Sequence, residues 1–277
     1  MRETLICTGR LGDNPYRFPE TGIEVYSYEE ICYYLSQHMI CYLQTLPDEE
    51  LLLFMKEELG LEKLAKTLSR LNNPDRDQMK YFAALFREGN YFHEEEIREI
   101  LDEYRSLKNA PVHRKYKMLG DLMMESRRAA AAMEYYDKAL ACKEISDKET
   151  GEICHNMGAA KMRLFRFQDA GLYFLKAYQK LEDEKSLFYY YAAICFKEGR
   201  EKAAEEIRNL EVSDLLLESF QHRMESFLEE FRHSDQSAAC QRLRFMSEND
   251  RAESSRIKRE KQVRSMQKKF RSELIRL

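Results

Sequence analysis

Tyr116-Lys117-Met118-Leu119-Gly120, followed by Ala132, Tyr136 and Ala139, is the stretch of sequence that decides the fold. Its glycine, its two alanines and its aromatic residue all recur 38 residues later. The recurring residues are Gly158, Ala170, Phe174 and Ala177. A third copy follows after 34 more residues, with Ala192 in the small-residue position, Gly199 at the turn and Ala204 in the second helix. A fixed period of this length predicts a solenoid of stacked helical hairpins rather than an enzyme core.

The pattern has a physical reason in the close packing of two antiparallel helices. A glycine or alanine in the first helix is expected to let the alanine of the second helix approach, because bulk at either position would separate them. The aromatic residue four positions after that alanine is expected to fill the space against the neighbouring hairpin. One hairpin cannot bury its own apolar face, so the copies must stack on one another.

With these residues in hand, the stretch from about Val112 to Leu210 resembles the tetratricopeptide repeat (TPR) family. The resemblance covers roughly a third of the chain and departs from the family pattern in places. The third copy has Arg208 and Glu211 where the aromatic residue and the last alanine belong. The good copies lack the usual closing proline, and residues 82–107 are counted only as a degenerate repeat. The resemblance implies an all-α, TPR-like helical-hairpin solenoid.

The segments around the repeats complete this all-α prediction. Residues 1–26 are expected to form a short β-hairpin around the turn from Pro19 to Gly22, and residues 27–110 a helical lead-in. Ser27 and Glu30 form a capping box that predicts a helix running to about Leu43. The repeats occupy residues 111–211, and residues 212–277 are expected to be long capping helices with a basic end. An apolar stripe predicts the first capping helix and consists of Leu217, Phe220, Met224, Phe227 and Phe231.

Composition favours a helix-rich cytoplasmic protein. Charged residues make up 34% and hydrophobic residues 44% of the chain, with only ten glycines and five prolines. The seven cysteines are odd in number and contain no C-x-x-C pair, so we expect them to be reduced. The sequence has no run that reads as a signal-peptide core or a membrane helix, so no membrane partner is expected.

No pattern in the sequence predicts catalysis. The six histidines form no H-E-x-x-H and no zinc-ligand spacing with cysteine, and the phosphate-binding and acyl-transfer motifs are absent from the sequence. The run His93-Glu94-Glu95-Glu96 is interpreted as the charged first turn of a helix. We therefore expect a non-enzymatic protein with no cofactor and no metal.

The resemblance to TPR proteins implies a binding groove lined by the first helix of each hairpin. The expected groove residues are Lys117, Asp121, Met124, His155, Asn156, Met162, Arg163, Tyr189, Phe196 and Lys197. Their mixture of charge with Met, Tyr and Phe suits a peptide or helix of a partner protein. Some family members grip a C-terminal carboxylate, but here Asp121 stands at a clamp position and would repel that charge. The alternative is a solvated face, or one covered by the chain's own C-terminal helix.

The basic end of the chain carries a competing signal. Residues 251–277 contain ten Lys or Arg and three Glu, a net charge of +7, which leaves −11 for residues 1–250. The residues of this basic tail that are expected to make contacts are Arg256, Lys258, Arg259, Lys261, Arg264, Lys268, Lys269 and Arg271. The tail is predicted to lie on an acidic surface, either its own or that of a partner, and self-association through this helix stays open. Nucleic acid is the weaker alternative, because Phe270 is the sole aromatic residue in the run.

Overall fold

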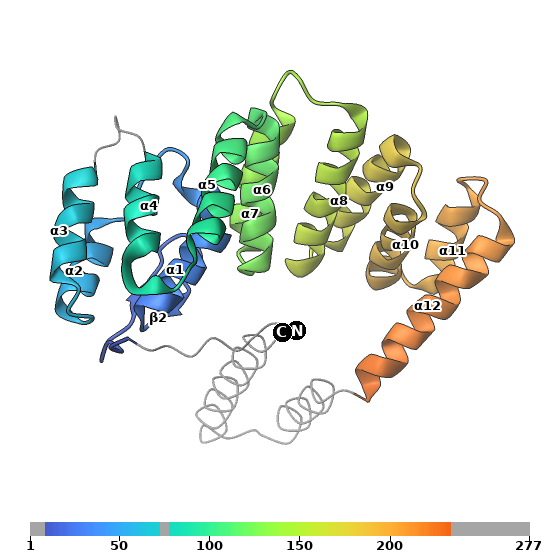
Figure 1. Cartoon of the computed structure of the whole chain (residues 1–277). Coiled ribbons are helices and arrows are strands. Elements are labelled where there is room, and N and C mark those ends of the chain that lie inside the picture. Colours follow the sequence, from blue (N-terminus) through green and yellow to red (C-terminus); the bar gives the residue numbers. More distant parts are fainter. Residues whose placement is uncertain (1–8, 73–77, 234–277) are drawn as a thin grey trace. The chain divides into compact units, whose positions relative to one another are not determined.

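A computed structural model of the chain describes residues 9–72 and 78–233 (Figure 1). The described part is all-α except for one two-stranded hairpin, which confirms the predicted fold class. It divides into two compact units, Met1–Ala193 and Ile194–Leu277, with the boundary inside α10 (Glu184–Glu198). None of the described helices is long and apolar enough to cross a membrane.

The N-terminal hairpin lies where the glycine and proline residues predict it. Strands β1 (Tyr16–Arg17) and β2 (Glu24–Val25) pair antiparallel. Gly22 has a φ of 78° and donates its N–H to the Phe18 carbonyl at 2.7 Å, which closes the turn. The Phe18 ring is fully buried and stacks on Tyr34, with ring centroids 3.5 Å apart. The hairpin is thereby fixed to the first helix.

Five α-helices and one 3-10 helix of the lead-in share a single core with the hairpin. They are α1 (Tyr28–Gln37), η1 (Met39–Tyr42), α2 (Glu49–Glu57), α3 (Glu62–Leu71), α4 (Gln78–Arg87) and α5 (Glu94–Asn109). Ser27 caps α1 as predicted, accepting from the Glu30 N–H at 3.1 Å. The helix ends at Gln37 and not near Leu43, because the chain tightens into η1. The core is rich in fully buried rings, including Tyr81, Phe82, Phe86 and Tyr104.

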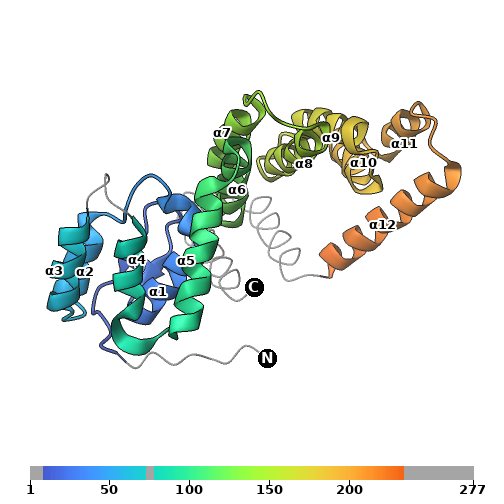
Figure 2. The same ribbon diagram turned by 45° about the horizontal axis from the view of Figure 1, so that its top comes forward.

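The next helices of the first unit form successive hairpins (Figure 2). They are α6 (Val112–Glu125), α7 (Ala129–Leu140), α8 (Asp147–Arg163) and α9 (Phe167–Leu181). Helix α6 packs on α7, α7 on α8 and α8 on α9. The two hairpin turns have the same backbone conformation at equivalent positions. Arg127 and Phe165, 38 residues apart, have φ of 59° and 57°. The N–H groups of Arg128 and Arg166 then reach back to carbonyls five residues earlier, at 2.8 and 2.9 Å.

Each repeat glycine accommodates an aromatic ring of its own hairpin. A Cβ added at Gly120 would lie 2.4 Å from the Tyr136 ring, and one at Gly158 would lie 2.7 Å from the Phe174 ring. Both rings are fully buried, as are Ala132 and Ala170. The sequence interpretation did not anticipate that the glycine makes room for the ring of its own hairpin. The ring lies across the glycine because only a residue without a side chain leaves space there. Phe174 also stacks on Tyr189 of the next hairpin, as expected for the aromatic position.

The second unit contains the end of α10 together with α11 (Arg200–Arg208) and α12 (Asp214–Arg232). Gly199 begins α11 with a φ of 96°, at the place in the third copy that Arg127 and Phe165 occupy in the first two. On α12 the predicted apolar stripe is covered only at its start: Leu217, Phe220 and Met224 are buried, but Phe227 is 55% exposed. The predicted basic helix falls outside the described residues.

Candidate functional site

Two of the expected groove residues, Lys117 of α6 and Asn156 of α8, meet at the carboxylate of Asp121. Lys117 Nζ lies 3.0 Å from Asp121 Oδ2. Asp121 Oδ1 accepts hydrogen bonds from the Tyr136 hydroxyl and the Asn156 amide, each at 2.7 Å. These bonds join α6, α7 and α8, so Lys117 and Asn156 are engaged within the chain. Asp121 thus connects the three helices through its hydrogen bonds. Its negative charge also disfavours the binding of a ligand carboxylate at this position.

His155 makes the equivalent junction between α8 and α10. Its Nδ1 lies 2.9 Å from the Ser186 hydroxyl, and its ring meets the rings of Phe174 and Tyr189 edge-on. Burial lowers the pKa of His155 below its ordinary value of 6.5, and nearby Lys185 lowers it further. The imidazole is therefore neutral at pH 7 and acts as a packed hydrogen-bonding group. Tyr189 covers Phe174 and keeps 37% of its own surface exposed.

The remaining expected groove residues divide into three cases. Met124 is buried in the core, so it does not line an open surface. Arg163 donates to the Met124 backbone carbonyl, and Met162 packs beside the buried cluster of Ala170 and Phe174. Phe196 and Lys197 belong to the second unit, where Phe196 is 41% exposed and Lys197 pairs with Glu198 at 2.5 Å. The expected residues of the basic tail, 256–271, lie outside the described part of the chain.

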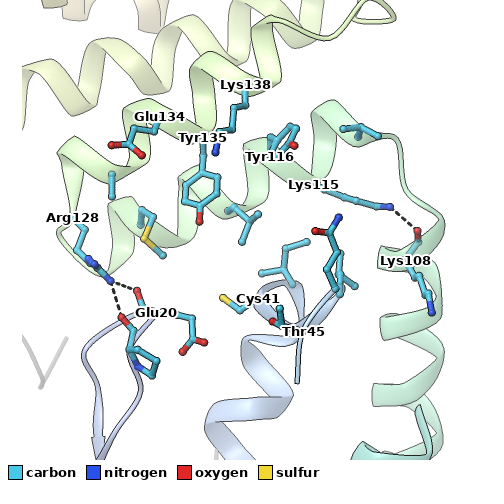
Figure 3. Close-up of a pocket in the computed structure, with 18 residues that line it drawn as sticks. Glu20, Cys41, Thr45, Lys108, Lys115, Tyr116, Arg128, Glu134, Tyr135 and Lys138 are labelled. Atoms are coloured by element: carbon cyan, nitrogen blue, oxygen red, sulfur yellow. Dashed lines mark hydrogen bonds between the residues drawn. The ribbon is translucent and has the colours of Figure 1, made fainter. Parts of the chain in front are cut away.

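A hollow of about 880 Å³ lies between the lead-in and the first hairpin (Figure 3). One side is formed by α6 and α7, and the other by η1, the residues after it, the turn of the N-terminal hairpin and the end of α5. Its apolar surface comes from η1 and α6, notably Ile40, Cys41, Leu119 and Met123. The Tyr135 side chain points from α7 into the hollow (Figure 3).

The hollow is lined by four cationic residues and only two carboxylates, Glu20 and Glu134. The cationic residues are Lys108, Lys115, Arg128 and Lys138. Arg128 Nη1 donates to the backbone carbonyls of Pro19 and Glu20, which links α7 to the hairpin turn. Lys115 Nζ donates to the Lys108 carbonyl at 2.6 Å. Lys138 lies over the Tyr135 ring, 5.4 Å from its centroid. Within residues 9–72 and 78–233, none of these four cations forms an ion pair.

The thiol in the hollow is not activated. Burial, together with the nearby Glu20 carboxylate, raises the pKa of Cys41 to about 12, so it remains protonated at neutral pH. Among the described residues, no group of three or more His, Cys, Asp or Glu side chains is arranged to hold a metal ion. The lining of the hollow combines apolar area and two tyrosines with four cations that form no ion pair to any described residue.

The sequence interpretation missed this hollow because it considered only one face of α6. The residues that line the hollow from α6 are spaced three or four apart and include Val112, Lys115, Leu119 and Met123. This spacing indicates a second apolar face on α6. A face that another helix covers completely has the same spacing, so the pattern does not distinguish an open hollow from a buried helix contact. Comparisons of the chain with protein-family models, with curated proteins and with solved structures find no match.

Proposed function

We propose that the chain is a non-enzymatic adaptor of the TPR type, which binds a peptide or helix of another protein on the face shared by α6, α8 and α10. One observation carries the proposal: the first helices of successive hairpins are bonded to each other along this face. Asn156 of α8 reaches Asp121 of α6, and His155 of α8 reaches Ser186 of α10. A face that is preorganised in this way loses little side-chain entropy when a partner binds.

Tyr189 is the residue of this face that we expect to contact the partner most strongly. Its ring is held by Phe174 and His155, with ring centroids 5.3 and 5.4 Å away, yet 37% of its surface is exposed. Rigid and partly exposed tyrosines are typical of residues that dominate binding energy. The proposed setting is the cytoplasm, where the buried thiols of Cys32 and Cys154 would remain reduced.

Quantitative affinity capture with the Tyr189→Ala variant tests this function. Full-length protein and the variant are used as baits in the same lysate, and the captured proteins are quantified by mass spectrometry. We expect at least one specific protein to fall about tenfold, the change produced by losing about 1.4 kcal/mol of contact energy. Leu172→Ala is the matched control, because Leu172 is 65% exposed on α9. Identical profiles for all three baits contradict the proposal.

The charge of the tail favours a second candidate function, the binding of an anionic partner. Residues 251–277 carry +7 in a chain whose total charge is −4. A chain that ends at Asp250 lacks that charge and keeps every described residue. If the tail binds nucleic acid, capture of nucleic acid is lost with the truncation and weakens steeply between about 50 and 200 mM salt. Capture that is equal for both chains excludes this function for the tail.

A further inference from the structure

We propose that the hollow between the lead-in and the first hairpin is a second docking surface, and that its occupant is an acidic amphipathic segment of a partner protein. The proposal does not depend on the function proposed above, because the two surfaces use different faces of α6. Residues of an α-helix are about 100° apart around its axis. By that spacing, Lys117 and Asp121 lie roughly opposite Lys115, Leu119 and Met123, which line the hollow.

The apolar floor of the hollow has the length of a helical segment. Its α6 side runs from Val112 to Met123, a rise of about 16 Å at 1.5 Å per residue. Val112 at one end is 56% exposed, although it is a large hydrophobic residue. Leu119 and Tyr116 between them are half-buried, and Tyr135 points into the same space from α7 (Figure 3). A strip of this length matches three turns of a helix better than it matches a compact metabolite.

The charged side chains around the apolar part of the hollow indicate that the occupant is acidic. Lys108, Lys115, Arg128 and Lys138 outnumber Glu20 and Glu134, so the lining is positive in a chain of net charge −4. Arg128 and Lys115 are held by backbone carbonyls, which fixes their positions, and neither forms an ion pair with a described residue. Glu20 receives the Tyr42 hydroxyl at 3.1 Å. An incoming Asp or Glu side chain would meet fixed cations that have no carboxylate partner among the described residues.

The same charges argue against the chain's own tail as the occupant. Residues 251–277 contain an apolar stripe, but their net charge is +7. A basic helix would place like charges next to Lys115 and Lys138, and such juxtaposition is unfavourable. The occupant is therefore assigned to another protein.

A displayed library of amphipathic peptides about 16 residues long provides the test. Apolar residues are fixed at the i, i+3, i+4 and i+7 spacing, and the other positions vary among Asp, Glu, Lys, Arg, Ser and Ala. The library is selected on immobilised full-length protein. The expected result is a set of enriched peptides in which Asp and Glu outnumber Lys and Arg. No enrichment, or enrichment without an acidic bias, overturns the proposal.

Paired variants then locate the binding site of the best acidic peptide by fluorescence polarisation. The double variant Lys115→Glu/Lys138→Glu is expected to weaken binding at least tenfold. Lys148→Glu/Lys176→Glu is the matched control, because it makes the same charge change at exposed lysines of α8 and α9 outside the hollow. Tyr135→Ser removes apolar area without altering charge and is also expected to weaken binding. Circular dichroism and a thermal melt verify that each variant is folded.

Tyr189→Ala separates this proposal from the proposed function. The variant is expected to bind the acidic peptide as the wild type does. If Tyr189→Ala abolishes binding while the lysine pair in the hollow does not, the peptide occupies the repeat face, and the docking proposal is overturned while the adaptor function stands. Equal weakening by both lysine pairs shows a general charge effect and also overturns the docking proposal.

Discussion

At the scale of single residues, the repeat glycines define how each hairpin closes. A methyl group at Gly120 would lie 2.4 Å from Tyr136, far inside van der Waals contact. The Gly120→Ala substitution gains about 1 kcal/mol of helix propensity. Overpacking costs about 1 to 3 kcal/mol, so we expect a net loss of stability. Urea unfolding of the variant measures it.

Gly171→Ala is the control for that experiment. A methyl group there would lie 3.7 Å from the Tyr190 ring, which is ordinary contact, and Gly171 also lies inside a helix. The variant is therefore expected to be more stable than the wild type by about 0.5 to 1 kcal/mol. If both variants shift stability in the same direction, the packing of the ring on the glycine does not control the hairpin.

The protonation of His155 is expected to make the folding stability depend on pH. Burial lowers its pKa in the folded state below 6.5, so the folded state binds its proton less readily than the unfolded state does. Its neutral form contributes stability that is complete above pH 6.5 and is lost as the pH falls from 6.5 through the folded-state pKa. We expect the unfolding free energy of the wild type to fall more steeply between about pH 7 and 5 than that of His155→Gln. A variant of the exposed His222, His222→Gln, should follow the wild type, and parallel curves for His155→Gln contradict the expectation.

At the scale of elements, the sequence predicted most of the fold and less of the site. Proline and glycine residues located the N-terminal hairpin and the turn at Gly199, because they act through local backbone geometry. The repeat turns at Arg127 and Phe165 contain neither residue type, and the 38-residue period predicted them instead. The end of α1 at Gln37 was missed, since the apolar pattern continues through η1 to Tyr42. Lys117 lies one helical turn from Asp121, but the hydrogen-bond partners Tyr136, Asn156 and Ser186 lie 15 to 35 residues from Asp121 or His155 in sequence. Only the stacked hairpins bring these residues together. The hollow depends on packing between the lead-in and α6, which no local pattern specifies.

The start of α8 is attached to the start of α6 through Glu149. The Ser146 hydroxyl, His113 and Arg114 all donate to its carboxylate, at 2.7, 3.0 and 2.9 Å. These bonds hold the pKa of Glu149 well below its ordinary value of 4.5, and the hydrogen bond from Ser146 lowers this pKa most. We expect Glu149→Gln to lower the unfolding free energy at pH 7 by about 1 kcal/mol.

The pH dependence of that loss identifies its cause. A carboxyl group with a lowered folded-state pKa contributes stability above pH 4.5, and this contribution disappears as the pH falls through the folded-state value. The difference between the wild type and Glu149→Gln should therefore shrink in acid. Thermal melts from pH 7 to 3 follow it, with Glu144→Gln as an exposed control. A difference that is constant with pH would mean that the charge of Glu149 is not involved.

At the scale of the whole molecule, the described cores of the first unit form a series rather than one centre. The lead-in core reaches from Tyr16 to Tyr104, and the hairpin core contains Ile40 together with residues from Leu122 to Ala160. Cys41, Leu43 and Leu107 pack against both. Ala170, Phe174 and Ala193 make a further cluster. In such a series each element depends mainly on its neighbours, so a local loss is expected to spread only a short distance.

Truncation tests this coupling directly. A chain that ends at Glu182 lacks α10, so Phe174 loses the ring of Tyr189 and Ala170 loses the packing of Ala193. We expect amide hydrogen exchange in α9 to accelerate at least tenfold, because about 1.4 kcal/mol of opening free energy corresponds to that factor. Exchange in α3 and α4 should stay within about twofold, since their core shares no residue with that cluster. A chain that ends at Glu198 keeps α10 and should restore protection in α9. Equal acceleration in α3, α4 and α9 would show that the first unit unfolds as one cooperative body, and a mutation anywhere in it would then weaken both proposed binding surfaces together.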